Sequence, residues 1–189
     1  MSKGRLEAFS DGVMAIVITI LVLSIEVPKG DSLRDLGNVG QSLFIYLISF
    51  TIVAIYWHNH HHFFHLIKNI DGGVLWMNSL FLFSLTLFPF ATSWVSQNLF
   101  SLYPSVLYGV VILLADIVFL GLMFSTKKCN AISLEYKKTL ISIFFSVLAL
   151  ILGIVIEPFL IILVNVLMLL LWVVPSKKIE KYIYSKEKN

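Results

Sequence analysis

The sequence predicts an all-α integral membrane protein whose residues 1–189 form a single domain of six transmembrane helices. Composition is the first reason: 58% of the 189 residues are hydrophobic, 13% are charged, and the mean hydropathy is +0.90. A water-soluble domain of this size cannot bury so much apolar surface. The second reason is that the apolar runs are too long for barrel strands but suit helices, which satisfy their own backbone hydrogen bonds in lipid.

Short turn signals divide the chain into six apolar segments. Pro28, Asp71 and Pro158 are among the residues that mark the divisions, and the linkers are too short to hold a soluble domain. Within the third segment Pro89 lacks a backbone donor and is expected to bend the helix. The expected transmembrane helices are residues 9–27, 40–67, 73–97, 104–125, 138–157 and 159–174.

The basic residues fall unevenly on the two sides of this predicted topology. Lys29 and Arg34 are alone on one side. The other side carries Lys3, Arg5, Lys68, Lys127, Lys128, Lys137, Lys138 and the lysines between Lys177 and Lys188. The positive-inside rule therefore predicts a cell-membrane protein with both termini in the cytoplasm. The net charge of +3 reflects lysines facing anionic lipid head groups, and no nucleic-acid partner is expected.

The first segment is short for a helix that faces lipid. Its uninterrupted apolar core, Gly12–Ile25, would be about 21 Å long as a helix, against about 30 Å of hydrocarbon. A helix surrounded by other helices, with water-filled vestibules at its ends, fits this length better. The first three and last three segments show no convincing repeat, so a central pathway would have to come from several copies of the chain.

Three motifs lie in the first three segments. An R-x-x-x-F-S-D pattern occupies residues 5–11, Y-W-H-N-H-H occupies 56–61, and W-M-N at 76–78 leads into F-P-F at 88–90. In these motifs the chain resembles bacterial members of the transmembrane-protein-175 potassium channel family. The last three segments match that family only in length and hydrophobicity.

The resemblance implies a potassium-permeable homotetramer in which the first helix of each subunit lines the pore. It implies no enzymatic activity and no cofactor, and the chain has no T-V-G-Y-G filter sequence. By their distance from the aspartate of the F-S-D motif, the aliphatic rings of the constriction fall on Ile16, Ile20 and Leu23. Spacings of four and three residues place these side chains on one helical face, and Thr19 borders them.

Polar motif residues are expected at the cytoplasmic ends of the first three helices. Charged groups near the hydrocarbon edge are stabilised by partners, so these residues are predicted to form a network that holds the first helix to its scaffold. The network residues are Arg5, Phe9, Ser10, Asp11, His60, His61 and Asn78.

All five histidines lie between His58 and His65, and four of them share a helical face at i, i+3, i+4 and i+7. His58 to His62 fits the H-x-x-H-H box of membrane di-iron enzymes, but such enzymes take histidines from several helices. No metal site is therefore predicted. A hydrogen-bonded or proton-sensitive cluster and an adventitious zinc or nickel site remain as alternatives.

Asp116 lies near the middle of the fourth expected helix. An unpaired carboxylate at that depth costs at least roughly 2.5 to 3.5 kcal/mol, so Asp116 should be protonated or partnered, with Asn165 as a candidate partner. The alternative function is a proton-coupled secondary transporter that uses Asp116 and the histidine cluster.

Overall fold

The structure is a computed structural model that describes residues 2–127 and 136–173. Within these ranges it contains helices and no strands. The helices are α1 (Lys3–Leu23), α2 (Leu33–Asn38), α3 (Gly40–Leu66), α4 (Gly72–Thr86), α5 (Phe88–Gln97), α6 (Leu102–Lys127), α7 (Lys137–Val155) and α8 (Phe159–Val173). The all-α prediction is therefore confirmed for the described part of the chain.

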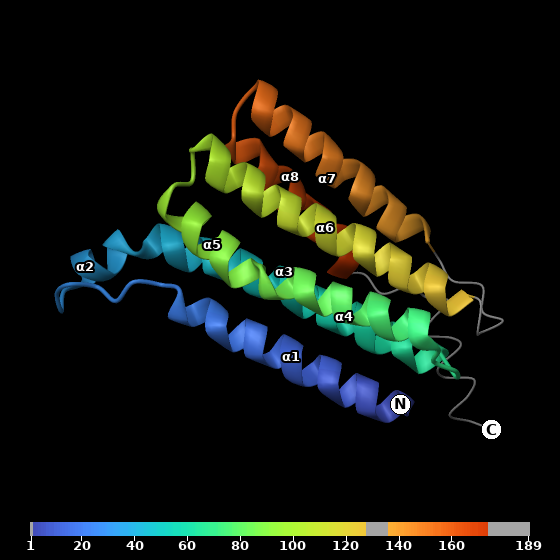
Figure 1. Ribbon diagram of the computed structural model, residues 1–189. Coiled ribbons are helices and arrows are strands. Elements are labelled where there is room, and N and C mark those ends of the chain that lie inside the picture. Colours follow the sequence, from blue (N-terminus) through green and yellow to red (C-terminus); the bar gives the residue numbers. More distant parts are fainter. Residues whose placement is uncertain (1, 128–135, 174–189) are drawn as a thin grey trace.

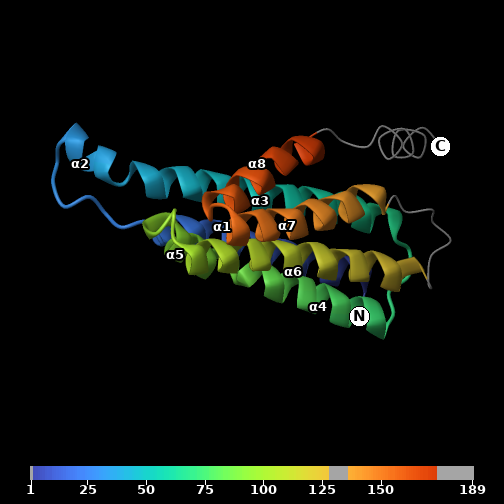
Figure 2. The ribbon, with the colours of Figure 1, turned by 90° about the horizontal axis from the view of Figure 1, so that it is seen from above.

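The long helices pack side by side with alternating direction (Figure 1). α1 runs along one side of the bundle and α7 along the other, with α3, α4, α5 and α6 between them. α1 packs on α3, α4 and α5, whereas α8 packs on α3, α6 and α7. In Figure 2 α8 lies over α3 and α7 and is inclined to them. The starts of α1, α4 and α7 and the ends of α3 and α6 thus gather at one end of the bundle.

Five segments of the described chain are long and apolar enough to cross a membrane. They are Lys3–Leu23, Gly40–Leu66, Gly72–Gln97, Leu102–Thr126 and Lys137–Val155. The sixth expected segment forms α8, which is apolar but has only 15 residues, or about 22 Å of helix. The chain is a multi-pass membrane protein whose described residues contain five segments of spanning length and one shorter apolar helix.

The first helix differs most from its predicted bounds of 9–27. It begins at Lys3, because the R-x-x-x-F-S-D motif is helical and its residue Leu6 is packed in the core with 2% of its surface exposed. It ends at Leu23, where the backbone N–H of Ser24 bonds the Leu21 and Val22 carbonyls. The motif is therefore the first part of the membrane helix and does not precede it.

The expected bend at Pro89 is an interruption of the helix. α4 ends at Thr86, Leu87 separates the two helices, and Pro89 lies in the first turn of α5. Proline is favoured in a first turn because the N–H that it lacks would have no helical partner there. The third segment is thus divided at Leu87, two residues before Pro89.

Two glycines allow α8 to approach α6 and α7 closely. Ile161 of α8 is fully buried beside Gly109 of α6 and Gly153 of α7. A Cβ atom on Gly109 would lie 2.6 Å from Cγ2 of Ile161, and a Cβ atom on Gly153 would overlap the same side chain. The short α8 is thus held by an interhelical contact that larger residues would prevent.

We expect Gly153→Ala to destabilise the subunit by about 1–3 kcal/mol, because the added methyl group overlaps Ile161 in a packed core. Thermal unfolding in detergent measures the effect. Gly4→Ala is the matched control, since a Cβ atom there meets nothing within 4 Å and alanine favours a helix. A Gly153→Ala variant as stable as the control would contradict this account of the packing.

Candidate pore helix and its anchoring network

α1 has one face inside the subunit and one face outside it. The buried face consists of Leu6, Ser10, Met14, Val17 and Leu21. On the opposite side the predicted constriction residues Ile16, Ile20 and Leu23 are 58%, 43% and 79% exposed. The three side chains therefore lie outside the buried face of α1 and are partly or largely exposed in the described part of one subunit.

Thr19 is also exposed on the outward side of α1. Its Oγ1 donates a hydrogen bond to the backbone carbonyl of Ile16 at 2.9 Å. Because the hydroxyl proton is directed back to the helix, the lone pairs of Oγ1 remain available as acceptors. An oxygen with free lone pairs can coordinate a cation on this otherwise aliphatic face.

A buried chain of hydrogen bonds joins α1 to α4 and α3. Nδ2 of Asn78 donates to Oγ of Ser10 at 2.9 Å, and Oδ1 of Asn78 lies 2.8 Å from Nε2 of His60. Because Oδ1 can only accept, His60 donates through Nε2. All three side chains are at most 1% exposed, so water cannot reach them. Their polar groups therefore depend on these hydrogen bonds, and losing one would leave a buried donor or acceptor without a partner.

A second polar contact joins α1 to α3 nearer the surface. Nε1 of Trp57 donates to Oδ1 of Asp11 at 2.9 Å. Ser10 and Asp11 are adjacent on α1. Through them α1 is hydrogen-bonded to Asn78 of α4 and to Trp57 of α3. These two hydrogen bonds at one end of α1 thus restrict its rotation about its own axis.

The structure brings together some of the predicted network residues and leaves others outside. Ser10, Asp11, His60 and Asn78 lie in the two linkages. Phe9 is 55% exposed and Arg5 is exposed, and neither makes a described hydrogen bond to the network. His61 lies on the surface, where its ring stacks on Trp57 with centroids 5.9 Å apart. The partner role of Trp57 was missed, although its position one turn before His61 was a usable signal.

Basic residues gather at the end of the bundle that holds this network. Lys3 and Arg5 lie at the start of α1, Lys68 follows α3, and Lys137 and Lys138 begin α7. Lys29 and Arg34 lie near α2, at the other end (Figure 1). Lys128 and the lysines between Lys177 and Lys188 are outside the described residues. The alternating helix directions therefore sort the described basic residues as the sequence predicts.

Asp116 is buried between α3, α6 and α7 and is surrounded by hydroxyl groups. Tyr56 donates to its Oδ1 at 2.7 Å, while Ser142 and Ser146 donate to its Oδ2 at 2.7 and 3.3 Å. Asp116 is 3% exposed, and no Lys or Arg within the described residues forms an ion pair with it. Three hydroxyl donors thus supply the partners that a carboxylate at this depth requires.

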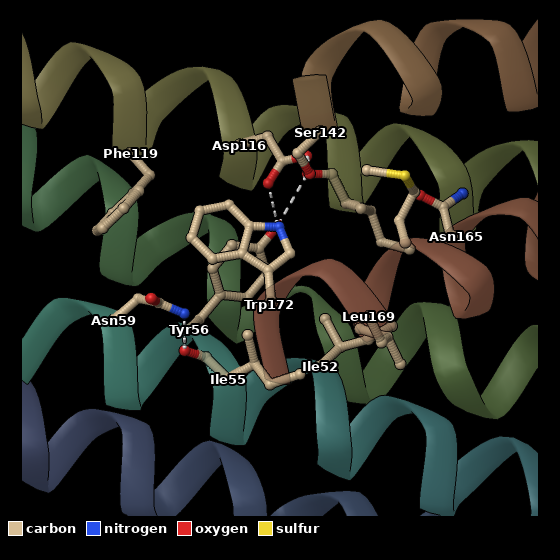
Figure 3. A pocket seen from close by; sticks show the side chains of 12 residues that line it. Ile52, Ile55, Tyr56, Asn59, Asp116, Phe119, Ser142, Asn165, Leu169 and Trp172 are labelled. Atoms are coloured by element: carbon tan, nitrogen blue, oxygen red, sulfur yellow. Dashed lines mark hydrogen bonds between the residues drawn. The ribbon is translucent and has the colours of Figure 1, made fainter. Parts of the chain in front are cut away.

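The expected partner Asn165 contacts Asp116 only indirectly. Ser146 lies 3.2 Å from Oδ1 of Asn165, so it stands between the two side chains. Asp116, Ser142 and Asn165 border a cavity of about 30 Å³ that Trp172 also lines (Figure 3). Ser142 and Ser146 were missed by sequence reasoning, although their i, i+4 spacing on α7 places both on one face.

We expect Asp116→Asn to lower stability by about 1–2 kcal/mol and to leave ion flux within about twofold of wild type. An amide has one carbonyl oxygen, so at least one of the three hydroxyl donors loses its acceptor. Thermal unfolding and flux in liposomes measure the two effects. Ser125→Ala on the same helix is the control, since its hydroxyl bonds only its own backbone at Gly121. Abolished flux would instead assign Asp116 a part in transport.

Four of the histidines form two pairs on α3. Nε2 of His58 lies 2.8 Å from Nε2 of His62, and Nε2 of His61 lies 3.0 Å from Nε2 of His65. No group of three or more potential metal ligands occurs among the described residues. The arrangement therefore differs from the multi-histidine centre of a di-iron enzyme.

The described residues thus form a bundle of membrane helices whose first helix is held by polar contacts on one side and is exposed on the other. The family model for the endosomal/lysosomal potassium channel TMEM175 matches residues 5–89. A potassium channel of Chryseobacterium sp. (strain P1-3) is 39% identical over 187 residues, which cover 96% of this chain and 97% of the relative. A potassium channel of Streptomyces collinus is 39% identical over 101 residues, covering 51% of this chain and 49% of the relative.

Structural comparison leads to the same family. The crystal structure of a lysosomal potassium-selective channel TMEM175 homolog from Chamaesiphon minutus superimposes with a TM-score of 0.75 and 28% sequence identity. The match covers 90% of this chain and 96% of that chain. The chain belongs to the TMEM175 family of ion channels, as the motifs of the first three helices predicted, and it is not an enzyme.

Proposed function

We propose that the chain is one subunit of a potassium-permeable homotetramer whose pore is lined by α1. The observation that carries this proposal is the outward face of α1, where a threonine lies among aliphatic side chains while the opposite face is fixed to α3, α4 and α5. Relatives that are named potassium channels support potassium as the permeant ion. Closed rotational symmetry suits a pore because each subunit contributes an identical wall.

In such a tetramer Ile16, Ile20 and Leu23 form three aliphatic rings. Residue spacings of four and three set these rings about 6 and 4.5 Å apart along the pore axis. Aliphatic rings disfavour water, so an ion crosses them at the cost of dehydration unless the side chains turn away. The Thr19 oxygen lies within this stretch and replaces part of the lost hydration.

The proposal includes the orientation of the subunit and the role of its last helix. The end that holds Ser10, Asn78 and His60 also carries most of the described basic residues, which supports a cytoplasmic location for it and for both termini. α8 acts as the sixth transmembrane helix, and its packing against α6 and α7 compensates for its shorter length. The network at the cytoplasmic end holds the pore helix against its scaffold.

Potassium flux into liposomes and native mass measurement in detergent test the proposal. The purified chain should carry potassium without a proton gradient, and its mass should be that of four subunits. A potassium uptake that requires a proton gradient would favour the transporter alternative. A monomeric mass together with retained flux would contradict the shared pore.

Crosslinking tests the position of α1 directly. With Cys129, the single cysteine, replaced by serine, Ile16→Cys should form disulfides between subunits under mild oxidation. Leu140→Cys on the exposed face of α7 is the matched control, since that side chain is 51% exposed and α7 lies on the opposite side of the bundle from α1. Crosslinking at Leu140→Cys but not at Ile16→Cys would place α1 away from the subunit interface.

A further inference from the structure

The two histidine pairs near the end of α3 are not used by the proposed pore. His58, His61 and His65 are exposed and His62 is half-buried, so the paired nitrogens lie near the surface. His60 is different, because it is buried and bonded to Asn78. Each pair joins residues one helical turn apart, which places both rings on the same side of the helix.

Each pair presents two imidazole nitrogens toward a single point. In a contact of 2.8 to 3.0 Å one Nε2 carries the proton and the other accepts it. A divalent metal ion can occupy the same point if the donating ring moves its proton from Nε2 to Nδ1, so that both Nε2 atoms become ligands. Zinc–nitrogen bonds of about 2.0–2.1 Å place two tetrahedral ligands about 3.3 Å apart, which requires only a small separation of the rings.

Imidazole ligands favour zinc, copper and nickel over the alkali ions that a potassium channel conducts. Two protein ligands leave the remaining coordination positions to water. We propose that each subunit binds divalent transition-metal ions at these two histidine pairs, at a site separate from the ion pathway. Once the ion is bound to one imidazole, the second imidazole is already held beside it by the same helix. The pair therefore binds the ion more tightly than either ring alone.

The His61–His65 pair is also connected to the pore helix. The ring of His61 stacks on Trp57 with an interplanar angle of 23°, and Trp57 donates to Asp11 of α1. A metal ion that fixes His61 therefore also fixes Trp57 and the hydrogen bond to α1. If α1 lines the pore as proposed above, the bound metal restrains the pore helix near Asp11, and it lowers flux.

Zinc titration by calorimetry, on the full chain without a polyhistidine tag, tests the metal site alone. We expect His58→Gln and His65→Gln each to remove one class of zinc site. The double variant should bind zinc more weakly by about tenfold or more. Binding should also weaken at acidic pH in the wild-type chain, because only neutral imidazole is a ligand. Zinc binding by the double variant that equals wild type would overturn the proposal, whatever the flux.

Potassium flux with and without zinc tests the connection to α1. Zinc should lower wild-type flux by at least about twofold, and His65→Gln should abolish this effect while its zinc-free flux stays at the wild-type level. His58→Gln should retain the effect. Flux that falls equally in wild type and His65→Gln would overturn the connection through Trp57. A wild-type chain that binds zinc but carries no potassium would leave the metal site standing and refute the proposed channel.

Discussion

Changing Ile16 to asparagine should raise potassium flux by about tenfold and reduce discrimination between potassium and sodium. In the proposed tetramer this substitution replaces an aliphatic ring with four amides, which hold water and can partly replace the hydration shell of an ion. A tenfold change corresponds to a barrier lower by about 1.4 kcal/mol, a modest share of what dehydration at an apolar ring costs. Flux of both ions into liposomes measures the effect.

The control for this variant separates pore lining from a general effect of a polar residue in the membrane. Leu140→Asn places the same amide on an exposed position of α7 and should leave flux per folded channel unchanged. Native mass measurement checks that both variants remain oligomeric. An Ile16→Asn channel that is intact but has wild-type flux and selectivity would show that Ile16 does not face the ion pathway.

Most of the helical segments were predictable because the length of an apolar run can be compared directly with the thickness of the membrane. The expected segments at 40–67 and 138–157 differ from α3 and α7 by two residues or fewer at each end. The start of α1 was not predictable in this way, because Arg5, Glu7 and Asp11 interrupt hydrophobicity without interrupting the helix. A polar side chain at the membrane edge reaches water or a partner, so hydropathy alone places the boundary too late.

The hydrogen-bond partners were harder to predict than the helices. Asp116 stands out in the sequence because a carboxylate is rare at that depth, whereas Tyr56, Ser142 and Ser146 do not. Hydroxyl residues are common in membrane helices and usually bond their own backbone, as Ser125 does at 3.0 Å. Only the packing of α3 and α7 against α6 shows which hydroxyls face the carboxylate.

The outward face of α1 poses a different difficulty. Lipid tails and the aliphatic side chains of a neighbouring subunit favour the same residues, so composition cannot distinguish a lipid-facing stripe from a pore-facing one. The polar contacts of α1 help, because a helix tied by Ser10 and Asp11 to its scaffold cannot rotate to hide either face. The pore-lining role of Ile16 is therefore proposed from the family motif and not from hydrophobicity.

Replacing Asn78 with leucine should cause the largest loss of stability of the substitutions considered, about 2–4 kcal/mol. The change removes two hydrogen bonds at once and leaves Nε2 of His60 buried among Phe64 and Phe81 without an acceptor. Ser10 is affected less, because its hydroxyl still donates to the Leu6 carbonyl at 2.8 Å. Thermal unfolding in detergent measures the loss, and native mass measurement shows whether the oligomer survives.

Ser79→Ala is the matched control for Asn78→Leu, since Ser79 follows Asn78 on α4 but is exposed and bonds its own backbone at Leu75. That variant should unfold within about 0.5 kcal/mol of wild type. Because the Asn78 contacts fix the rotation of α1, Asn78→Leu should also disturb the proposed pore and change flux in channels that remain assembled. If Asn78→Leu matched Ser79→Ala in both stability and flux, the buried linkage from α1 through α4 to α3 would not be what positions the first helix.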